Sequence, residues 1–151
     1  MRIIKATVRD LDLLVPLFEG YRTFYRLSSE RSKVRSYLAA RLASGEATVF
    51  LAIEGRGASR RALGFTLLYP TFSSLSMARA WVLNDLFVSP DARESGVASA
   101  LMERAEILAR RTKAAYLVLE TADTNRKAQA LYERRGWTRE RGFRHYTLAV
   151  T

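Results

Sequence analysis

The order of apolar patterns along this chain predicts one α/β domain, built on a mixed, mostly antiparallel sheet of about seven strands with helices on both faces. Short apolar runs rich in β-branched residues alternate with longer runs whose apolar residues recur at helical spacing. Their order is one strand, two helices, three strands, a helix, a strand, a helix and two strands. The length of 151 residues suits a single core, and no linker or repeat divides it.

The first third of the chain is expected to form a strand and two helices. Residues 2–8 have a strand pattern, and Asp10 is a suitable N-cap for a helix whose apolar residues recur every three or four positions. Pro16 should kink this helix or delay its start, because proline lacks the N–H that an interior helical position donates. A second helix is expected to begin after Ser28 or Ser29.

The middle of the chain predicts three strands. Residues 47–54 and 62–69 form an expected β-hairpin, because a polar, glycine-rich turn joins them. Pro70 is expected to end the second of these strands. After a loop, the apolar run at residues 81–88 predicts a buried strand at the centre of the sheet.

The last third continues with a helix over residues 97–110, a strand over 115–121 and a helix over 125–135. Gly136 is a typical residue to follow the last of these helices. Two short strands, residues 137–138 and 143–150, are expected to complete the sheet.

Composition narrows the chemistry. The chain has 25 Lys and Arg against 15 Asp and Glu, a net charge of +10, which favours a ligand with several phosphates or a nucleic acid. The basic residues are scattered and no nucleic-acid-binding module is recognisable, so nucleic acid is not expected as the partner. The absence of cysteine excludes disulfides, thiolate nucleophiles and cysteine-bound zinc. With His145 as the single histidine and no acidic cluster at ligand spacing, no metal site is expected.

No segment has the composition of a membrane span or of a secretion signal. No apolar run approaches the roughly 20 residues that a transmembrane helix needs, and the first residues lack an apolar signal core. We therefore expect a cytoplasmic protein that has no membrane partner.

The segment between the strand at residues 81–88 and the helix that follows is expected to bind an anion. Arg93-Glu94-Ser95-Gly96-Val97-Ala98 opens the helix, where backbone N–H groups and the helix macrodipole favour a phosphate or pyrophosphate. The small residues Gly96 and Ala98 allow a ligand to approach the main chain.

Three motifs in order resemble the core of the GNAT superfamily of acyl-CoA-dependent N-acetyltransferases. They are the strand Leu86-Phe87-Val88 with Pro90 after it, the loop at residues 93–98, and Asn125-x-x-Ala128-x-x-Leu131-Tyr132-Glu133-x-x-Gly136-Trp137. The resemblance implies a single GNAT domain over residues 1–151, in which the central strand splays from its neighbour. It also implies acetyl-CoA as cofactor and transfer of its acetyl group to an amine by direct attack.

The resemblance assigns a set of residues to acetyl-CoA. Backbone groups of the strand would pair with the pantetheine arm, and those of the loop would hold the pyrophosphate. Tyr132 would donate a proton to the departing thiolate, since a phenol is protonated at neutral pH. Taken alone, Tyr132 also suits core packing, and Asn125 also suits a helix N-cap. The cofactor-binding residues expected in this way are Leu86, Phe87, Val88, Arg93, Glu94, Ser95, Gly96, Val97, Ala98, Ser99, Asn125, Ala128 and Tyr132.

A base is needed to deprotonate the amine, and two carboxylates on neighbouring expected strands are candidates, Asp85 and Glu120. Locally the chain resembles polyamine acetyltransferases, in which a Glu-Asp pair precedes the Phe-Val of the strand. Here Asn84 replaces the first acid of that pair. Asp85 matches the second, and it is either the base or a buried structural acid, because strand alternation turns it away from Asn84.

The acceptor side is expected to include two tyrosines one helical turn apart, Tyr21 and Tyr25, together with Asn84 and Glu120. The pattern Tyr-Arg-x-Phe-Tyr followed by Asn-Asp-Leu-Phe-Val resembles a branch related to the yeast histone and D-amino-acid acetyltransferases. That branch implies a small-molecule amine, polyamine or amino acid as acceptor, and a homodimer or higher oligomer. A protein or peptide acceptor, and a non-catalytic domain that senses acyl-CoA, remain as alternatives.

Overall fold

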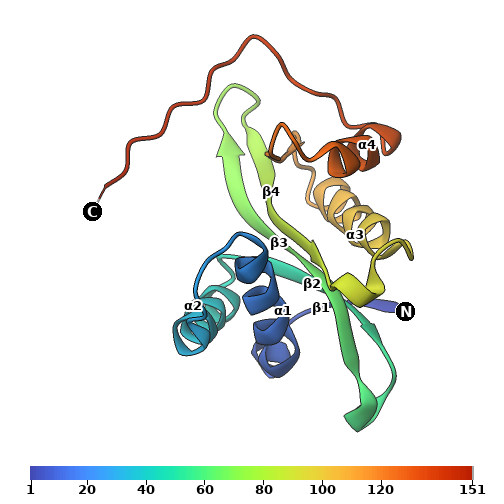
Figure 1. The fold of residues 1–151 in the computed structure, drawn as a ribbon. Helices are drawn as coiled ribbons and strands as arrows, with labels where there is room; N and C mark the ends of the chain where they lie inside the picture. Colours follow the sequence, from blue (N-terminus) through green and yellow to red (C-terminus); the bar gives the residue numbers. More distant parts are fainter. Residues whose placement is uncertain (151) are drawn as a thin grey trace. The chain divides into compact units, whose positions relative to one another are not determined.

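The computed structural model describes residues 1–150 of the chain. The chain divides into two compact units, Met1–Leu119 and a C-terminal unit that begins at Glu120 (Figure 1). Each unit is described by itself below. No helix in the described part of the chain combines the length and apolar character needed to cross a membrane.

The N-terminal unit contains a five-stranded sheet whose spatial order follows the chain, β1-β2-β3-β4-β5. Neighbouring strands are antiparallel except β4 and β5, which are parallel, so the sheet is mixed. The strands are β1 (Arg2–Lys5), β2 (Thr48–Glu54), β3 (Arg61–Ser73), β4 (Ala78–Val88) and β5 (Leu117–Val118).

Helices cover both faces of this sheet (Figure 1). On one face, α1 (Leu11–Phe24) packs on β3 and β4, and α2 (Arg31–Ser44) packs on α1. On the other face lies α3 (Val97–Arg111). Each helix buries its apolar side. In the layer of α1 and α2, the fully buried residues include Leu14 and Leu38 on the helices and Phe65 and Leu67 on β3. On α3 they include Leu101, Met102 and Ala105.

Three short 3-10 turns connect the elements of this unit. They are η1 (Val8–Asp10), η2 (Gly57–Ser59) and η3 (Pro90–Ala92). The backbone N–H of Thr7 donates to the Asp10 carboxylate at 2.9 Å, and the Thr7 hydroxyl accepts from Arg9, which closes a capping box. Helix α1 starts immediately after η1, as the pattern predicts, and it includes Pro16, so the expected delayed start is wrong.

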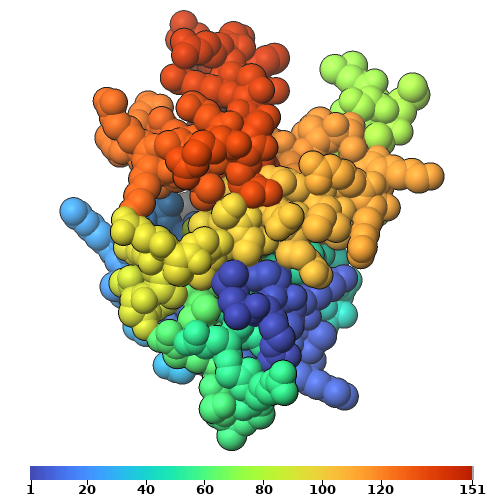
Figure 2. All heavy atoms as spheres, turned by 90° about the vertical axis from the view of Figure 1, so that its right-hand side faces the viewer, coloured from blue at the N-terminus to red at the C-terminus, as the bar shows by residue number. Residues whose placement is uncertain are grey.

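The hairpin of β3 and β4 is longer than predicted. Pro70 does not end β3 but lies inside it, opposite Trp81. Strand β2 pairs with β3 only as far as Leu68, so Pro70 occupies a stretch of β3 with a single neighbouring strand. An edge position tolerates a residue that has no N–H to donate. The expected loop after Pro70 is therefore reduced to a turn at residues 74–77, which protrudes in Figure 2 (light green).

The expectation of seven strands is wrong, since the described residues form five. The strand expected over residues 115–121 is only Leu117–Val118, and residues 137–138 and 143–150 form no strand. The apolar alternation of residues 143–150 is that of a strand, but a strand also needs an edge to bond with, and these residues are exposed. Among the described residues of the C-terminal unit there is one helix, α4 (Arg126–Arg134).

Candidate active site

A β-bulge at Asn84 shapes the centre of strand β4. Leu83 lies opposite Leu68 and Asp85 lies opposite Leu67, so Asn84 is the one extra residue on β4. Bulges re-aim neighbouring side chains and are common beside active sites. Here the Asn84 side chain is exposed while Asp85 is buried, yet the amide Nδ2 of Asn84 still donates to Oδ2 of Asp85 at 3.1 Å.

Asp85 is a buried carboxylate held by hydrogen bonds. It is 7% exposed, and its carboxylate accepts from the Tyr21 hydroxyl and from Asn84. Burial raises the pKa of Asp85, and the two hydrogen bonds offset part of that rise. The buried Thr66 hydroxyl donates to the backbone carbonyl of Asp85 at 2.9 Å, which fixes the main chain at this point.

The phenol of Tyr21 lies beside this carboxylate. The Tyr21 ring, on α1, meets the rings of Phe65 and Tyr25 edge-on at 5.8 Å and 5.1 Å. Burial raises the pKa of Tyr21, and the charge of Asp85 raises it further, so the phenol stays protonated and donates. Within this unit Tyr21 contacts Tyr25, and Tyr21 and Asn84 both donate to Asp85, whereas Glu120, expected on the same acceptor side, belongs to the C-terminal unit.

A further tyrosine close to Asp85, Tyr69, was not predicted. The hydroxyls of Tyr37 on α2 and Tyr69 on β3 share a hydrogen bond. Burial raises the pKa of Tyr69, and Tyr37 and the charge of Asp85 raise it further. No sequence signal marks Tyr69, because its position depends on the register of β3 and β4, in which Tyr69 follows Leu67, the partner of Asp85, by two positions.

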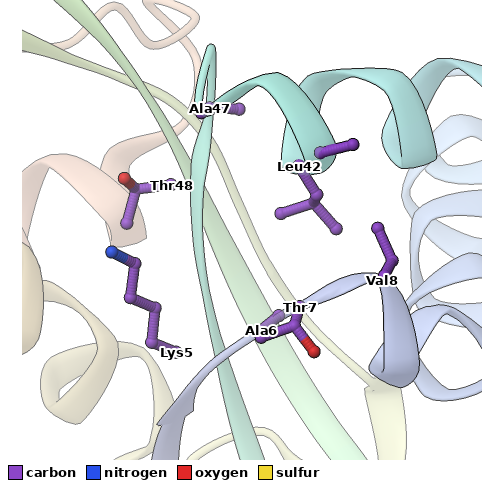
Figure 3. Close-up of a pocket in the computed structure, with 9 residues that line it drawn as sticks. Lys5, Ala6, Thr7, Val8, Leu42, Ala47 and Thr48 are labelled. Atoms are coloured by element: carbon purple, nitrogen blue, oxygen red, sulfur yellow. The ribbon is translucent and has the colours of Figure 1, made fainter.

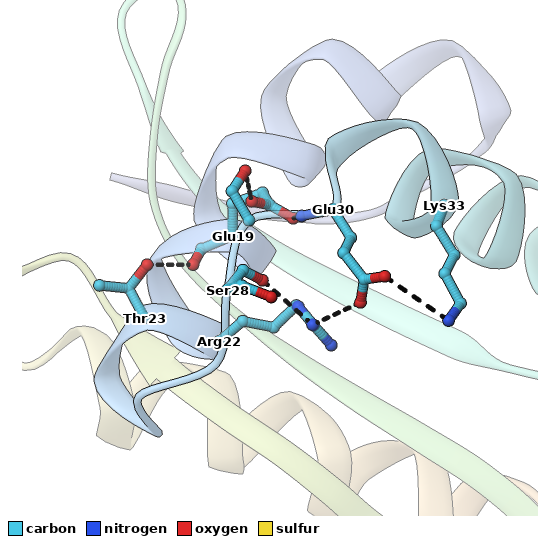
Figure 4. Close-up of polar contacts among 7 residues, drawn as sticks. Glu19, Arg22, Thr23, Ser28, Glu30 and Lys33 are labelled. Atoms are coloured by element: carbon cyan, nitrogen blue, oxygen red, sulfur yellow. Dashed lines mark hydrogen bonds and ion pairs between the residues drawn. The ribbon is translucent and has the colours of Figure 1, made fainter.

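The α1–α2 connection, next to Tyr21 and Tyr25, is braced by charged groups (Figure 4). Arg22 Nη2 donates to the carbonyl of Ser28 at 3.2 Å and to Glu30 at 2.9 Å. The carboxylate of Glu19 accepts from the Ser29 hydroxyl at 2.5 Å and from the backbone N–H of Glu30 at 3.3 Å. These bonds hold the end of α1, where the two tyrosines lie.

The loop from β4 to α3 presents its main chain at the surface (Figure 2, yellow). Glu94 and Gly96 have φ angles of 59° and 82°, so two left-handed residues flank Ser95 just before α3 begins at Val97. Such alternation turns backbone N–H groups to one side and makes a concavity for an anion. Only a residue without Cβ adopts the Gly96 conformation without strain.

One edge of β4 is open between the bulge and this loop. Strand β5 pairs with β4 only at Trp81 and Val82, and β4 continues to Val88 without that neighbour. Within the described residues no strand pairs with the β5 side of residues 83–88, and apart from the Val88 carbonyl, which accepts from Arg93, this stretch suits an extended ligand. Leu86, Phe87 and Val88, expected to bind the cofactor, lie in this stretch.

Arg93 joins the loop to the aromatic cluster of α1 and β4. Its Nε donates to the carbonyl of Val88 at 3.1 Å, and its guanidinium lies 5.8 Å from the ring centroids of both Phe24 and Phe87. The guanidinium thus makes cation–π contacts with both rings, and the hydrogen bond holds the start of the loop against the end of β4.

The remaining expected site residues belong to the C-terminal unit. Asn125 is the N-cap of α4, since its Oδ1 accepts from the backbone N–H of Ala128 at 3.3 Å, which confirms its expected capping role. Tyr132 lies on α4 with its ring centroid 6.2 Å from that of Trp137. Glu120 is exposed, and its carboxylate is 3.3 Å from Nδ1 of His145.

A separate cavity of about 330 Å³ lies between the end of β1, the end of α2 and the start of β2 (Figure 3). None of the expected site residues lines it, and Lys5 is its one charged residue. Its lining residues are Lys5, Ala6, Thr7, Val8, Leu42, Ala43, Gly45, Ala47 and Thr48.

The bulged strand, its open edge and the left-handed loop before α3, on a mixed sheet covered by helices, define a protein of the GNAT fold. The family model described as the acetyltransferase (GNAT) family matches residues 14–137. The chain belongs to this family.

Relatives of this chain carry acetyltransferase names. It is 43% identical over 150 residues to the uncharacterized N-acetyltransferase YhfO of Bacillus subtilis (strain 168), covering 99% of this chain and 98% of that protein. A probable acetyltransferase of Haemophilus influenzae (strain ATCC 51907 / DSM 11121 / KW20 / Rd) is 31% identical over 122 residues, or 81% of this chain and 82% of that one.

Solved structures agree with the fold. The crystal structure of a probable acetyltransferase is 42% identical and has a TM-score of 0.93, over 100% of this chain and 99% of that one. A ribosomal-protein-alanine N-acetyltransferase from Brucella melitensis biovar Abortus 2308 has a TM-score of 0.78 at 21% identity, over 99% and 100% of the two chains. At that identity the likeness concerns the fold alone.

Proposed function

We propose that this protein transfers an acetyl group from acetyl-CoA to the primary amine of a small molecule, an amine, a polyamine or an amino acid, by direct attack. The observation that carries the proposal is the open edge of β4, which runs from the Asn84 bulge into the left-handed loop before α3. An extended amide-bearing arm with a pyrophosphate at its end fits this edge and loop in sequence.

In this proposal, main-chain groups hold the cofactor. Backbone groups of Leu86, Phe87 and Val88 bond with the pantetheine amides, and the N–H groups of residues 94–99 hold the pyrophosphate. Asn125 and Ala128, at the start of α4, are assigned to the same arm. Arg93 keeps the loop in place through its bond with the Val88 carbonyl. Acetyl-CoA supplies a thioester, which is an activated acetyl group.

Asp85 is proposed to accept the proton that the acceptor ammonium must lose. Deprotonation leaves the amine lone pair free to attack, and the C–N bond forms as the C–S bond breaks. The thiolate then takes a proton from the hydroxyl of Tyr132, the nitrogen loses its second proton as the amide forms and this proton restores the phenol through solvent, and Asp85 releases its own proton to solvent. Tyr21, Tyr25 and Asn84 orient the amine and the carboxylate, and Glu120 is assigned to the acceptor side.

The same proposal includes a single catalytic domain over the whole chain, action in the cytoplasm, where acetyl-CoA is consumed, and assembly as a homodimer. Alignment of thioester and amine supplies much of the rate in such a transfer, so a rigid carboxylate beside an open strand edge is an apt arrangement.

The test is a thiol-release assay with acetyl-CoA and a panel of polyamines, amino acids, other small amines and peptides, together with calorimetry of CoA binding. We expect micromolar CoA binding and thiol release that depends on a small amine. Thiol release with peptides alone would show that the acceptor is a protein or peptide and not a small molecule. Tight CoA binding without thiol release for any acceptor would show that the protein is an acyl-CoA sensor and not an enzyme.

A further inference from the structure

Arg61, the first residue of β3, connects three segments of the N-terminal unit by charged hydrogen bonds. It lies opposite Glu54 at the end of the β2–β3 ladder, and its Nε and Nη2 bond with Oε1 of Glu54 at 2.8 Å and 2.7 Å. Its other terminal nitrogen, Nη1, donates to Oδ2 of Asp91 in η3. A planar guanidinium that is bonded to two carboxylates has a fixed orientation, so Arg61 joins the β2–β3 hairpin to the turn after β4.

Asp91 has a second donor within its own turn. The Ser89 hydroxyl donates to Oδ1 of Asp91 at 2.6 Å, while Arg61 bonds with Oδ2. The hydrogen bonds from Ser89 and Arg61 lower the pKa of Asp91, so the carboxylate stays ionised and the contact is charge-assisted. The backbone N–H of Ser89 donates to the carbonyl of Leu63 on β3 at 2.8 Å. The start of η3 is therefore attached to β3 at two points.

The η3 turn continues directly into the left-handed loop before α3. Ala92, its last residue, is buried, and its carbonyl accepts from the Ser95 hydroxyl at 2.5 Å. Ser95 lies between the two left-handed residues, Glu94 and Gly96. A displacement of η3 therefore reaches the loop through the main chain and through the Ser95 bond.

We propose that Arg61 is a positioning residue for the cofactor, which sets the place of the loop before α3 by holding Asp91. The inference rests on the proposed acetyl-CoA site, in which N–H groups of this loop bind the pyrophosphate. A backbone anion site binds well only while its N–H groups converge, so a displaced segment loses affinity. The ion pairs of Arg61 are about half exposed, and such pairs contribute little to the free energy of unfolding. Their effect is on loop geometry.

Asp91→Asn is the sharpest test, because charge and position predict opposite results. Loss of a negative charge close to the site should by itself strengthen the binding of an anion. The proposal predicts that the Kd for CoA, measured by calorimetry, rises about fivefold, because a neutral amide no longer forms a charge-assisted pair with Arg61. An unchanged or lower Kd would overturn the proposal.

Arg61→Gln removes the same contact from the other side, and Arg60→Gln is its matched control. Arg60 is also paired, with Asp10 of η1 at 3.2 Å, and has no contact with η3. Both variants lose one positive charge at neighbouring positions, so Kd should rise about fivefold more in Arg61→Gln than in Arg60→Gln. Tm should fall no more in Arg61→Gln, since Asp10 is buried and Asp91 is exposed. Equal Kd values, or a larger fall of Tm in Arg61→Gln, would contradict a positioning role.

Hydrogen exchange of the ligand-free protein tests the same contact without the cofactor. The N–H groups of Ser89 and Ala92 both donate to backbone carbonyls. We expect them to exchange at least about threefold faster in Asp91→Asn and in Arg61→Gln, and at the wild-type rate in Arg60→Gln. If wild type fails to bind CoA, the proposed function fails, and exchange still decides the role of Arg61. Wild-type exchange rates in both η3-contact variants would overturn the inference even if CoA binds.

Discussion

The hydroxyl of Tyr21 on α1 donates a hydrogen bond to the buried carboxylate of Asp85 beside the bulge of β4. The bond joins a helix of one face to the central strand, and it belongs to a set in which Asn84 donates to the same carboxylate. Because burial raises the pKa of Asp85 and the Tyr21 bond lowers it, the tyrosine helps to keep the carboxylate ionised. A base must be ionised before it can accept a proton.

The first prediction concerns Tyr21→Phe. Loss of the hydroxyl removes a bond that favours the ionised form, so the pKa of Asp85 rises further. The acid limb of the profile of kcat against pH should move to higher pH, and kcat at neutral pH should fall by about tenfold, or ~1.4 kcal/mol in barrier. Tyr37→Phe is the control, because it removes a hydroxyl that bonds with Tyr69 and not with Asp85. An unmoved acid limb in Tyr21→Phe would show that Tyr21 does not act on the base.

The second prediction sets stability against activity at Asp85. Asp85→Asn removes the proposed base, and we expect acetyl transfer to fall by about 100-fold or more. The folded protein should become more stable at neutral pH, because the amide avoids the cost of a buried charge and its oxygen still accepts the Tyr21 bond. The expected rise in Tm is a few degrees.

The pH dependence of that rise follows from the raised pKa of Asp85. Below the ordinary pKa of aspartate the carboxyl is protonated in both folded and unfolded chains, so wild type loses nothing by burying it. As pH increases through the raised folded-state pKa, wild type must bury a charge and loses stability. The Tm difference between Asp85→Asn and wild type should therefore grow across this range and then level off. A difference that is constant from pH 3 to pH 8 would contradict it.

Patterns within short windows of the sequence predicted much of this molecule. The apolar spacing of α1 and α3, the hairpin of β2 and β3 and the loop before α3 all follow from local residues, and the structure confirms them. The Asn84 bulge and the Tyr69 position depend on register between β3 and β4, which local residues do not determine. Residues 143–150 have the alternation of a strand but form none in the structure, because alternation alone provides no edge for the backbone to bond with.

The third prediction concerns Tyr132. If its hydroxyl protonates the leaving thiolate, Tyr132→Phe should lower kcat by about 100-fold while the Kd for CoA changes by less than about threefold. The ring contact with Trp137 is retained in phenylalanine, so the fold of the C-terminal unit should be preserved. The measurement is steady-state thiol release paired with calorimetry of CoA binding. Unchanged kcat would remove Tyr132 from the role of acid and leave it as a packing residue.

The fourth prediction concerns the close approach of the β3 and β4 backbones at Gly64, next to the loop that leads from β4 to α3. A Cβ at Gly64 would be 2.7 Å from the backbone carbonyl oxygen of Phe87, a contact that only a shift of the strands relieves. Gly64→Ala should therefore destabilise the fold by about 2 kcal/mol and weaken CoA binding, because the displaced residues lead into the loop.

Gly20→Ala is the matched comparison, since its Cβ would meet the Phe87 ring at 3.3 Å instead of backbone. A side chain moves more easily than a strand, and alanine favours a helix by roughly 1 kcal/mol over glycine, so Gly20→Ala should be much milder. Equal losses of Tm and of CoA affinity in the two variants would show that the approach of the β3 and β4 backbones does not control the loop.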